Sequence, residues 1–203
     1  MPELNIHFSR EEFAERQQRV RNSMCEQELD GLLLFKIEDM YWLTGYDSDG
    51  FCIFGTMFIG TDGQLTQLVR PADLGNASYS SICEDVRTAP DSQNSNRAEQ
   101  VKDLLKSLKM KGKRVGIQVD TMGLTPRLFL QIKESLSDWC ELIVVGDFIR
   151  ELRLVKSSQE LAYIRKAGEI LDTALTKTLE VVTSGIFEGD IYATFYDALF
   201  RLD

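Results

Sequence analysis

The chain has 203 residues, of which 43% are hydrophobic and 27% are charged, a composition typical of a globular protein. Its 23 Lys and Arg against 32 Asp and Glu give a net charge of −9, which argues against nucleic acid and anionic membranes as partners. Because no apolar run approaches the roughly 20 residues of a spanning helix, and the polar N-terminus lacks the apolar core of a signal peptide, we expect a cytoplasmic protein.

The first predicted elements are a helix and a buried strand. Ser9 and Glu12 form the capping box S-R-E-E, which predicts a helix that begins there and continues to about Glu28. Residues 31–35 are apolar throughout, which predicts a short strand buried on both faces.

A hairpin is predicted next. Residues 51–59 are apolar almost throughout and predict a central strand, and residues 61–63 form a tight-turn signal. Residues 65–69 alternate apolar and polar side chains, so they should pair antiparallel with the central strand. The dipeptide at positions 70 and 71, Arg-Pro, ends that strand, and a further short strand is expected near residues 84–88.

Helices and strands then alternate. Residues 96–110 predict an amphipathic helix, residues 114–119 a strand, and residues 141–145 a last strand. Between these strands, Thr125 and Pro126 open a second helix. The alternation, together with the hairpin, predicts an α/β domain over residues 1–150, with a mixed sheet flanked by helices.

Residues 151–203 form a separate, helical region. Ser157 and Glu160 make a second capping box, and apolar residues follow at steps of three or four, which predicts a helix of about seven turns. A second helix is predicted over residues 188–200. Two helices with apolar faces cannot bury both faces against each other, so we expect them to need a sheet or a partner.

Histidine and cysteine content limits the chemistry. His7 is the only imidazole and lies in the N-terminal tail, so neither a Ser-His-Asp or Cys-His site nor most kinds of zinc site is expected. A carboxylate-only magnesium site stays possible, although no acidic cluster at a strand end stands out for it. Four widely spaced cysteines form no C-x-x-C pair and are expected to be buried thiols: Cys25, Cys52, Cys83 and Cys140. No catalytic residue and no metal ligand are therefore assigned.

Two segments resemble the creatinase, prolidase and aminopeptidase P family of metallohydrolases. Residues 40–46, MYWLTGY, are similar to the signature of the family's N-terminal domain. Residues 152–167, LRLVKSSQELAYIRKA, are similar to its interdomain junction. The residues of the two motifs are most similar to those of bacterial Xaa-Pro-peptidase-like and ectoine-hydrolase-like members. The resemblance implies a creatinase/prolidase-like N-terminal domain over residues 1–150, then an interdomain linker and the first two helices of an incomplete pita-bread catalytic domain over residues 151–203.

The resemblance also implies a function. Family members hydrolyse C–N bonds with two divalent metal ions (Mn, Co or Zn) held by two aspartates, one histidine and two glutamates, and none of these ligands can be placed in this sequence. We therefore expect this chain to carry no cofactor, to build a homo-oligomer, in the simplest case a dimer, and to wall off the small-molecule or short-peptide substrate of a full-length parent. The alternative is a stand-alone, non-enzymatic module for dimerisation or partner binding.

The resemblance places the substrate pocket near the signature and the apolar segment that follows it. Seven residues are candidates to line that pocket: Tyr46, Asp47, Asp49, Phe51, Phe54, Thr56 and Arg70. Creatinase-type members present Phe-Gly-Arg where this chain has Phe-Gly-Thr at positions 54–56, so the cation that would grip a carboxylate is missing and creatine is disfavoured as a substrate.

Each candidate also has a plainer interpretation. Asp47 and Asp49 could act as an acid–base pair, because alternate residues of an extended segment share a face, or could simply cap a polar turn. Tyr46 and Phe51 could contact substrate or pack in the core. Arg70 could face the cleft or could form ordinary ion pairs.

Overall fold

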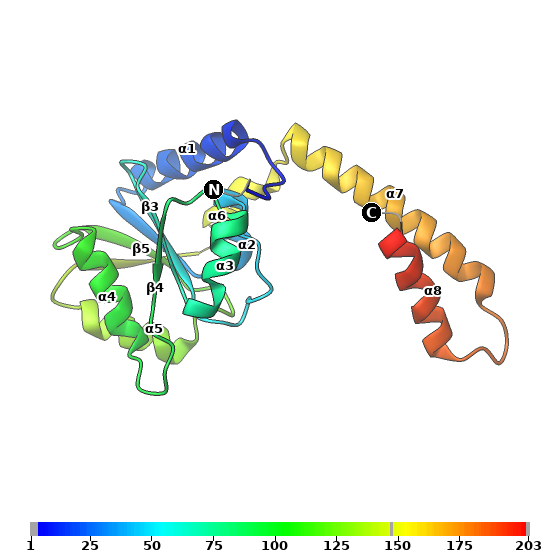
Figure 1. Ribbon diagram of the computed structural model, residues 1–203. Helices are drawn as coiled ribbons and strands as arrows, with labels where there is room; N and C mark the ends of the chain where they lie inside the picture. The colour runs from blue at the N-terminus through cyan, green and yellow to red at the C-terminus, as the bar shows by residue number, and fades with distance from the viewer. Residues whose placement is uncertain (1–3, 147, 202–203) are drawn as a thin grey trace. The chain divides into compact units, whose positions relative to one another are not determined.

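The computed structural model describes residues 4–146 and 148–201, which divide into two compact units with the boundary after Leu154. The first is an α/β unit and the second is a pair of helices (Figure 1). The strands of the first unit are β1 (Gly31–Leu34), β2 (Thr56–Gly60), β3 (Leu65–Val69), β4 (Asp85–Thr88), β5 (Arg114–Gln118) and β6 (Glu141–Val145). Its helices are α1 (Arg10–Glu26), α2 (Ile37–Thr44), α3 (Leu74–Ser80), α4 (Arg97–Ser107), α5 (Pro126–Leu136) and α6 (Phe148–Leu154), with a 3-10 turn over Pro71–Asp73.

The six strands form one mixed sheet, in the order β4-β3-β2-β1-β5-β6. β1 pairs antiparallel with β2, and β2 pairs antiparallel with β3, which confirms the predicted hairpin. The other neighbours, β1 with β5, β5 with β6 and β3 with β4, are parallel. The predicted α/β architecture with a mixed sheet is therefore confirmed.

Helices cover both faces of this sheet (Figure 1). Successive side chains of a strand point to opposite faces. In β1, Leu32 and Leu34 pack on the face covered by α1, α2 and α6. Leu33 and Phe35 pack on the face covered by α4 and α5. The apolar run of β1 is thus explained by burial on both sides.

The prediction of a strand over residues 51–59 is wrong in its first half. β2 begins only at Thr56, and residues 51–55 form an irregular loop. The side chain of Phe54 packs against that of Phe35, with 6.4 Å between the ring centroids, so an apolar residue is covered here without strand pairing. A short apolar run does not by itself distinguish a strand from a packed loop.

The three short helices α2, α3 and α6 are not foreseen by the sequence patterns. Each has only seven or eight residues, which is too short for a helical period to stand out. α2 matters most, because it carries the signature segment and begins directly after β1.

The expectation of four buried thiols holds for only half of them. Cys83 and Cys140 are buried, whereas Cys25 and Cys52 are exposed. Cys25 lies on the solvent side of α1, and Cys52 lies in the irregular loop that replaces the expected strand. Cys52 is therefore exposed because the segment expected to form a buried strand is a loop.

Stability at alkaline pH should depend on Cys83. Burial raises the pKa of this thiol from 9.0 to about 11. Because the folded thiol holds its proton more tightly than the unfolded one, its contribution is complete below pH 9 and is lost as the pH rises from 9 to about 11. We expect the unfolding free energy to fall by about 2 kcal/mol more over this window in the native chain than in Cys83→Ala.

Urea titrations at pH 8 and at pH 11 would measure this difference. The exposed Cys25→Ala serves as the control, and its stability should follow the native pH dependence. Parallel pH profiles for the native chain and Cys83→Ala would contradict the prediction.

The second unit consists of α7 (Ser158–Val181) and α8 (Glu188–Arg201). The capping box is confirmed, since Ser157 Oγ accepts from Glu160 N at 3.1 Å and Glu160 Oε2 accepts from Ser157 N at 2.8 Å. The buried side chains between the helices are small, namely Ala174, Thr178 and Ala198.

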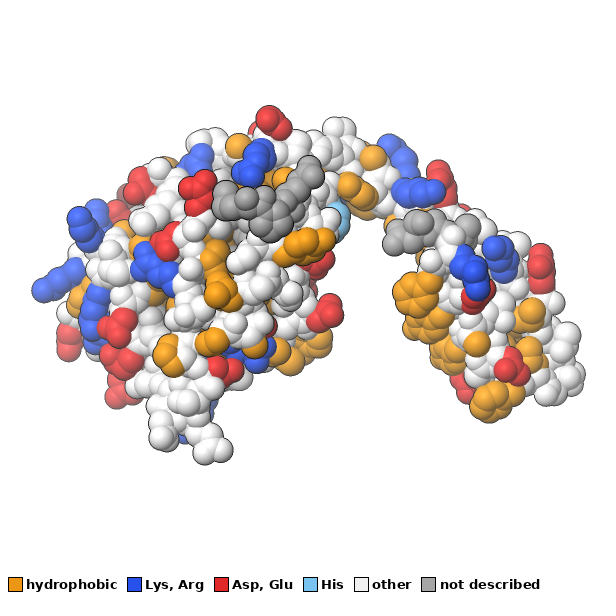
Figure 2. Space-filling model, viewed as in Figure 1, with side chains coloured by type: hydrophobic (Ala, Val, Ile, Leu, Met, Phe, Trp, Pro, Cys, Tyr) orange, Lys and Arg blue, Asp and Glu red, His pale blue; other side chains and the backbone are white. Residues whose placement is uncertain are grey.

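Large apolar side chains of both helices stay exposed, and they gather on the surface of this unit (Figure 2). They include Leu161, Ile164, Leu171, Leu175, Leu179 and Val182 on or next to α7, and Tyr192, Tyr196 and Phe200 on α8. The expectation that the two helices do not cover their apolar faces by themselves is met within this unit. In the parts of the chain that the structure describes, no helix combines the length and apolar character needed to cross a membrane.

Candidate functional site

The candidate site is built around the loop of residues 45–55, which joins α2 to β2. Gly45 ends α2 with a φ of 81°, in the left-handed region that favours glycine. A Cβ atom at this position would lie 2.7 Å from the carbonyl oxygen of Ser80. The glycine of the T-G-Y signature is therefore needed twice, once for the turn and once for the close approach of α3.

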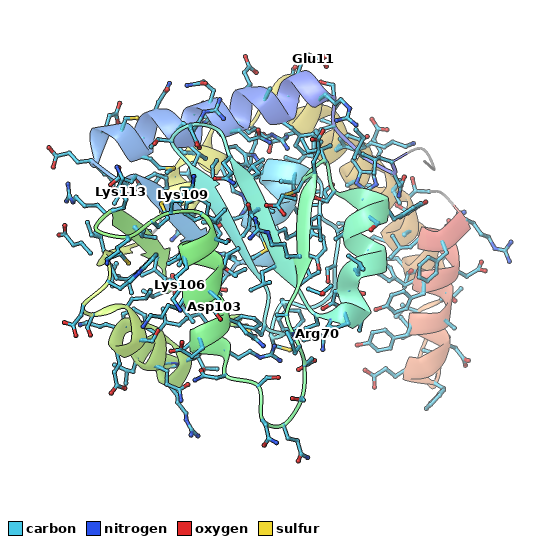
Figure 3. The ribbon with its side chains drawn as sticks, turned by 60° about the vertical axis from the view of Figure 1, so that its left-hand side comes forward. Glu11, Arg70, Asp103, Lys106, Lys109 and Lys113 are labelled. Atoms are coloured by element: carbon cyan, nitrogen blue, oxygen red, sulfur yellow. The ribbon has the colours of Figure 1, made fainter. Side chains whose placement is uncertain are left out.

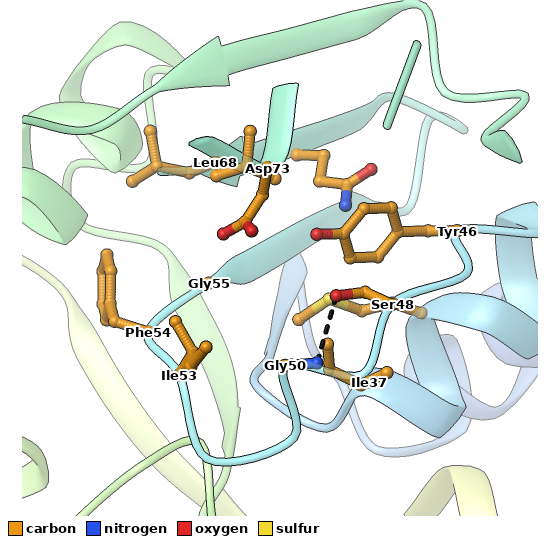
Figure 4. Close-up of a pocket in the computed structure, with 12 residues that line it drawn as sticks. Ile37, Tyr46, Ser48, Gly50, Ile53, Phe54, Gly55, Leu68 and Asp73 are labelled. Carbon is orange, nitrogen blue, oxygen red and sulfur yellow. Dashed lines mark hydrogen bonds between the residues drawn. The ribbon is translucent and has the colours of Figure 1, made fainter. Parts of the chain in front are cut away.

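Three hollows adjoin this loop. The inner hollow lies between the loop and the end of β3, and Tyr46, Ser48 and Asp73 face it (Figure 4). Its cavity is about 10 Å³, which is the space of one water molecule. Burial raises the pKa of the Tyr46 phenol, and the hydrogen bond with Ser48 opposes that effect. Tyr46 is thus a neutral hydrogen-bonding group at neutral pH.

Gln67 gives the inner hollow a further polar group. Its side chain is fully buried, and its Oε1 accepts from Ser81 Oγ at 3.4 Å, whereas its Nε2 has no protein partner. A buried amide donor without a partner is costly, so a small hydrogen-bond acceptor in this hollow would stabilise it. The hollow is too small for a peptide or an amino acid.

The outer hollow contains the two aspartates. Asp47 and Asp49 line it together with Asn5, Asn76 and Tyr79, around a volume of about 280 Å³. The backbone N–H of Asp47 donates to Ser80 Oγ at 2.9 Å, which fixes the start of the loop against α3. The two carboxylates therefore share one hollow, as their alternate spacing predicts.

The third hollow lies on the other side of the loop and is the largest, at about 540 Å³. We call it the switch groove. It is lined by Lys36 and Glu38 at the start of α2, Phe51 of the loop, and Val119, Asp120, Thr121, Met122, Leu124 and Pro126 between β5 and α5.

The remaining two candidates are engaged within the fold. Thr56 is buried, and its hydroxyl donates to the carbonyl oxygen of Leu34 at 2.9 Å. Arg70 binds Asp73 through two hydrogen bonds of 2.7 and 3.0 Å and lies 3.6 Å from a carboxylate oxygen of Asp91. The guanidinium fork is therefore occupied by carboxylates of this chain.

The seven candidates are thus divided among separate surroundings. Tyr46 and Phe54 line the inner hollow, Asp47 and Asp49 the outer hollow, and Phe51 the switch groove. Sequence reasoning missed the residues that complete these hollows: Lys36, Glu38, Gln67, Asp73 and Asp120. Two of them could have been found from the order of elements, because Lys36 and Asp120 closely follow the parallel strands β1 and β5.

The residues present do not fit the pair of metal ions that the resemblance implies. Among residues 4–146 and 148–201, no three or more His, Cys, Asp and Glu side chains gather in a way that could hold a metal ion. His7 Nδ1 instead lies 2.8 Å from the hydroxyl of Tyr41. No reaction step through a metal can therefore be assigned to these residues.

Comparison with known proteins gives a consistent picture. The family model of the creatinase/prolidase N-terminal domain matches residues 16–155. An uncharacterized hydrolase/peptidase of Sinorhizobium fredii, y4tM, is 26% identical over 95% of this chain and 51% of its own length. The ectoine hydrolase of Halomonas elongata is 24% identical over 97% of this chain and 51% of its own length.

A solved structure shares the fold. An Xaa-Pro dipeptidase from Bacillus anthracis superposes with a TM-score of 0.74 at 19% identity, over 93% of this chain and 49% of that one. The chain spans about half the length of the curated relatives it matches.

Proposed function

Because the chain belongs to the creatinase/prolidase N-terminal domain family, we propose that it is the non-catalytic N-terminal portion of a metal-dependent hydrolase that cleaves C–N bonds. The family match over residues 16–155 carries this proposal, since it spans nearly the whole α/β unit. The substrate of the parent would be a short peptide or a small molecule. Similarity to an ectoine hydrolase and to an Xaa-Pro dipeptidase supports that range without choosing within it.

The role of the α/β unit would be to line the substrate pocket of the parent with the loop of residues 45–55. Asp47, Asp49 and Phe51 are exposed on this loop, so they can contact a substrate that is bound by a neighbouring domain or subunit. Thr56 and Arg70 serve the fold itself and are poor candidates for substrate contact. The metal ligands and the chemical step would come from residues outside this chain.

The partners would be a second copy of the chain and the parent's substrate, in the cytoplasm. Nucleic acid is disfavoured as a partner by the net charge of −9 and by the ion pairs that two lysines of the α4 surface form with aspartates. Lys106, Lys109 and Lys113 lie along α4 and the turn after it (Figure 3). Lys106 pairs with Asp103 at 2.8 Å and Lys113 with Asp30 at 3.0 Å, which weakens this cluster as a polyanion site.

The exposed apolar side chains of α7 and α8 favour a second candidate. In a stand-alone module without enzymatic activity, these faces would pair with another copy, because exposed apolar patches mark association sites. Both candidates predict an oligomer, but only the first predicts a catalytic domain elsewhere in the protein.

Activity and sedimentation measurements on the purified chain test the proposal. We expect no hydrolysis of glycyl-proline with added Mn²⁺, no Mn²⁺ binding by calorimetry, and a dimer in analytical ultracentrifugation. Turnover that disappears with a chelator would overturn the assignment of the metal ligands to residues outside this chain. A monomer at high concentration would overturn the proposed role in assembly.

A further inference from the structure

The switch groove lies where the connections from two neighbouring parallel strands part to opposite faces of the sheet. After β1 the chain passes into α2, which packs on one face, and after β5 it passes into α5, which packs on the other. The groove is lined by the residues that follow both strands. In open α/β sheets, the crevice at such a topological switch point is where ligands bind.

The backbone segments that line the groove are held in place by close contacts next to it. A Cβ atom at Gly123 would lie 2.4 Å from the carbonyl oxygen of Phe35, so the segment after β5 lies directly against the end of β1. Thr121 Oγ1 donates to the same carbonyl oxygen at 3.4 Å and accepts from Gly123 N at 3.2 Å. The groove is therefore a preformed feature of the α/β unit, with a volume in the usual range of small-molecule sites.

The lining combines charges of both signs with apolar surface. Lys36 is half-buried at the N-terminal end of α2 and supplies a positive charge to the groove lining. The carboxylates of Glu38 and Asp120 are exposed, and no ion pair of either is seen within the described residues. Phe51 and Met122 are 52% and 66% exposed, so both offer apolar surface to a ligand in the groove.

From this lining we infer that the switch groove binds a small zwitterion of the α-amino-acid type with an apolar side chain. The ammonium of Lys36 takes the ligand's carboxylate, and the carboxylates of Asp120 and Glu38 take its ammonium. Phe51 and Met122 cover the apolar part of the ligand. This site goes beyond the proposed function, because it requires no metal, no hydrolysis and no catalytic domain.

Three related probes test the contribution of each ligand charge separately. L-Leucine carries both charges, N-acetyl-L-leucine lacks the ammonium, and L-leucinamide lacks the carboxylate. We expect leucine to shift the amide NMR signals of residues 119–124 in a saturable titration. The dissociation constants of the two blocked probes should each be larger by about threefold or more, the effect of one partly exposed ion pair.

Two variants assign the charges to residues. The double variant Asp120→Asn/Glu38→Gln should abolish the preference for leucine over N-acetyl-L-leucine, and Lys36→Met should abolish the preference over L-leucinamide. Asp138→Asn and Lys111→Met remove exposed charges of the same sign outside the groove and should leave both preferences intact. Folding of each variant is checked from the unchanged signals of β2 and β3.

The outcomes are distinct. Binding of leucine with both preferences, each lost in its own variant, supports the site. Equal affinity for all three probes, or no saturable shifts at residues 119–124, overturns it. Neither result bears on the metal and activity measurements, so this inference and the proposed function can fail independently.

Discussion

Replacing Arg153 by methionine is expected to lower the unfolding free energy of the α/β unit by about 3 kcal/mol. Arg153 lies on α6 and donates to Oδ1 of Asp39 at 2.5 Å. Asp39 lies on α2 with no solvent exposure, and its Oδ2 accepts from Gln118 Nε2 of β5 at 2.5 Å. Removing the guanidinium leaves a buried carboxylate with one neutral donor, which is among the costlier single changes in a folded protein.

A double-mutant cycle makes this prediction specific. Asp39→Asn removes the charge and keeps a similar shape, so the loss caused by Arg153→Met should be much smaller in an Asp39→Asn background. Arg127→Met removes an exposed arginine from α5 and should change stability by less than about 0.5 kcal/mol. Urea unfolding followed by tryptophan fluorescence measures all four variants. A loss for Arg153→Met as small as that for Arg127→Met would refute the role of the ion pair.

This contact also links the start of α2, directly before the signature segment, with the beginning of the junction segment. Asp39 directly precedes the signature segment, and Arg153 lies in the junction segment, 114 residues later. The C-terminal end of α2 is held from the other side by α1, where Arg16 donates to Trp42 O at 3.0 Å and Gln17 to Leu43 O at 2.9 Å. The helix that carries the signature segment and the first residues of the junction segment therefore both serve the packing of the α/β unit.

The sheet was predictable because its strands carry strong local signals. The alternation of residues 65–69 and the turn before it specify the hairpin, and the fully apolar β1 is buried on both faces. The loop of residues 45–55 was not predictable in the same way. Its apolar side chains have the composition of a strand, but their conformation is set by contacts with β3, α3 and the segment after β5, which are distant in sequence.

The sequence predicted which region of the chain forms the site, but not how its residues are arranged. Tyr46, Asp47, Asp49 and Phe51 do lie around one loop, yet they line separate hollows, because the loop turns its successive side chains in different directions. Arg70 illustrates a second limit. Nothing in its own sequence position shows that a carboxylate three residues later occupies its guanidinium, which only the 3-10 turn over Pro71–Asp73 brings about.

Gly45→Ala is expected to lower the unfolding free energy by about 3 kcal/mol and to shift the loop that it begins. Two costs add at this position. A non-glycine residue at a φ of 81° is strained by about 1–2 kcal/mol. In addition, the new Cβ would lie 2.7 Å from a backbone oxygen of Ser80, so the loop or α3 must move to avoid the clash.

Gly112→Ala separates these two costs. Gly112 has a φ of 69°, but a Cβ added there would meet no heavy atom within 4 Å, so only the conformational cost of about 1 kcal/mol should appear. The difference between the two alanine variants therefore measures the close approach of α3 to the loop. Amide signals of residues 46–55 should shift in Gly45→Ala and stay in place in Gly112→Ala. Equal destabilisation by the two variants would show that α3 moves away from the new Cβ atom at no energetic cost. The loop would then not be held rigidly enough to shape a substrate pocket.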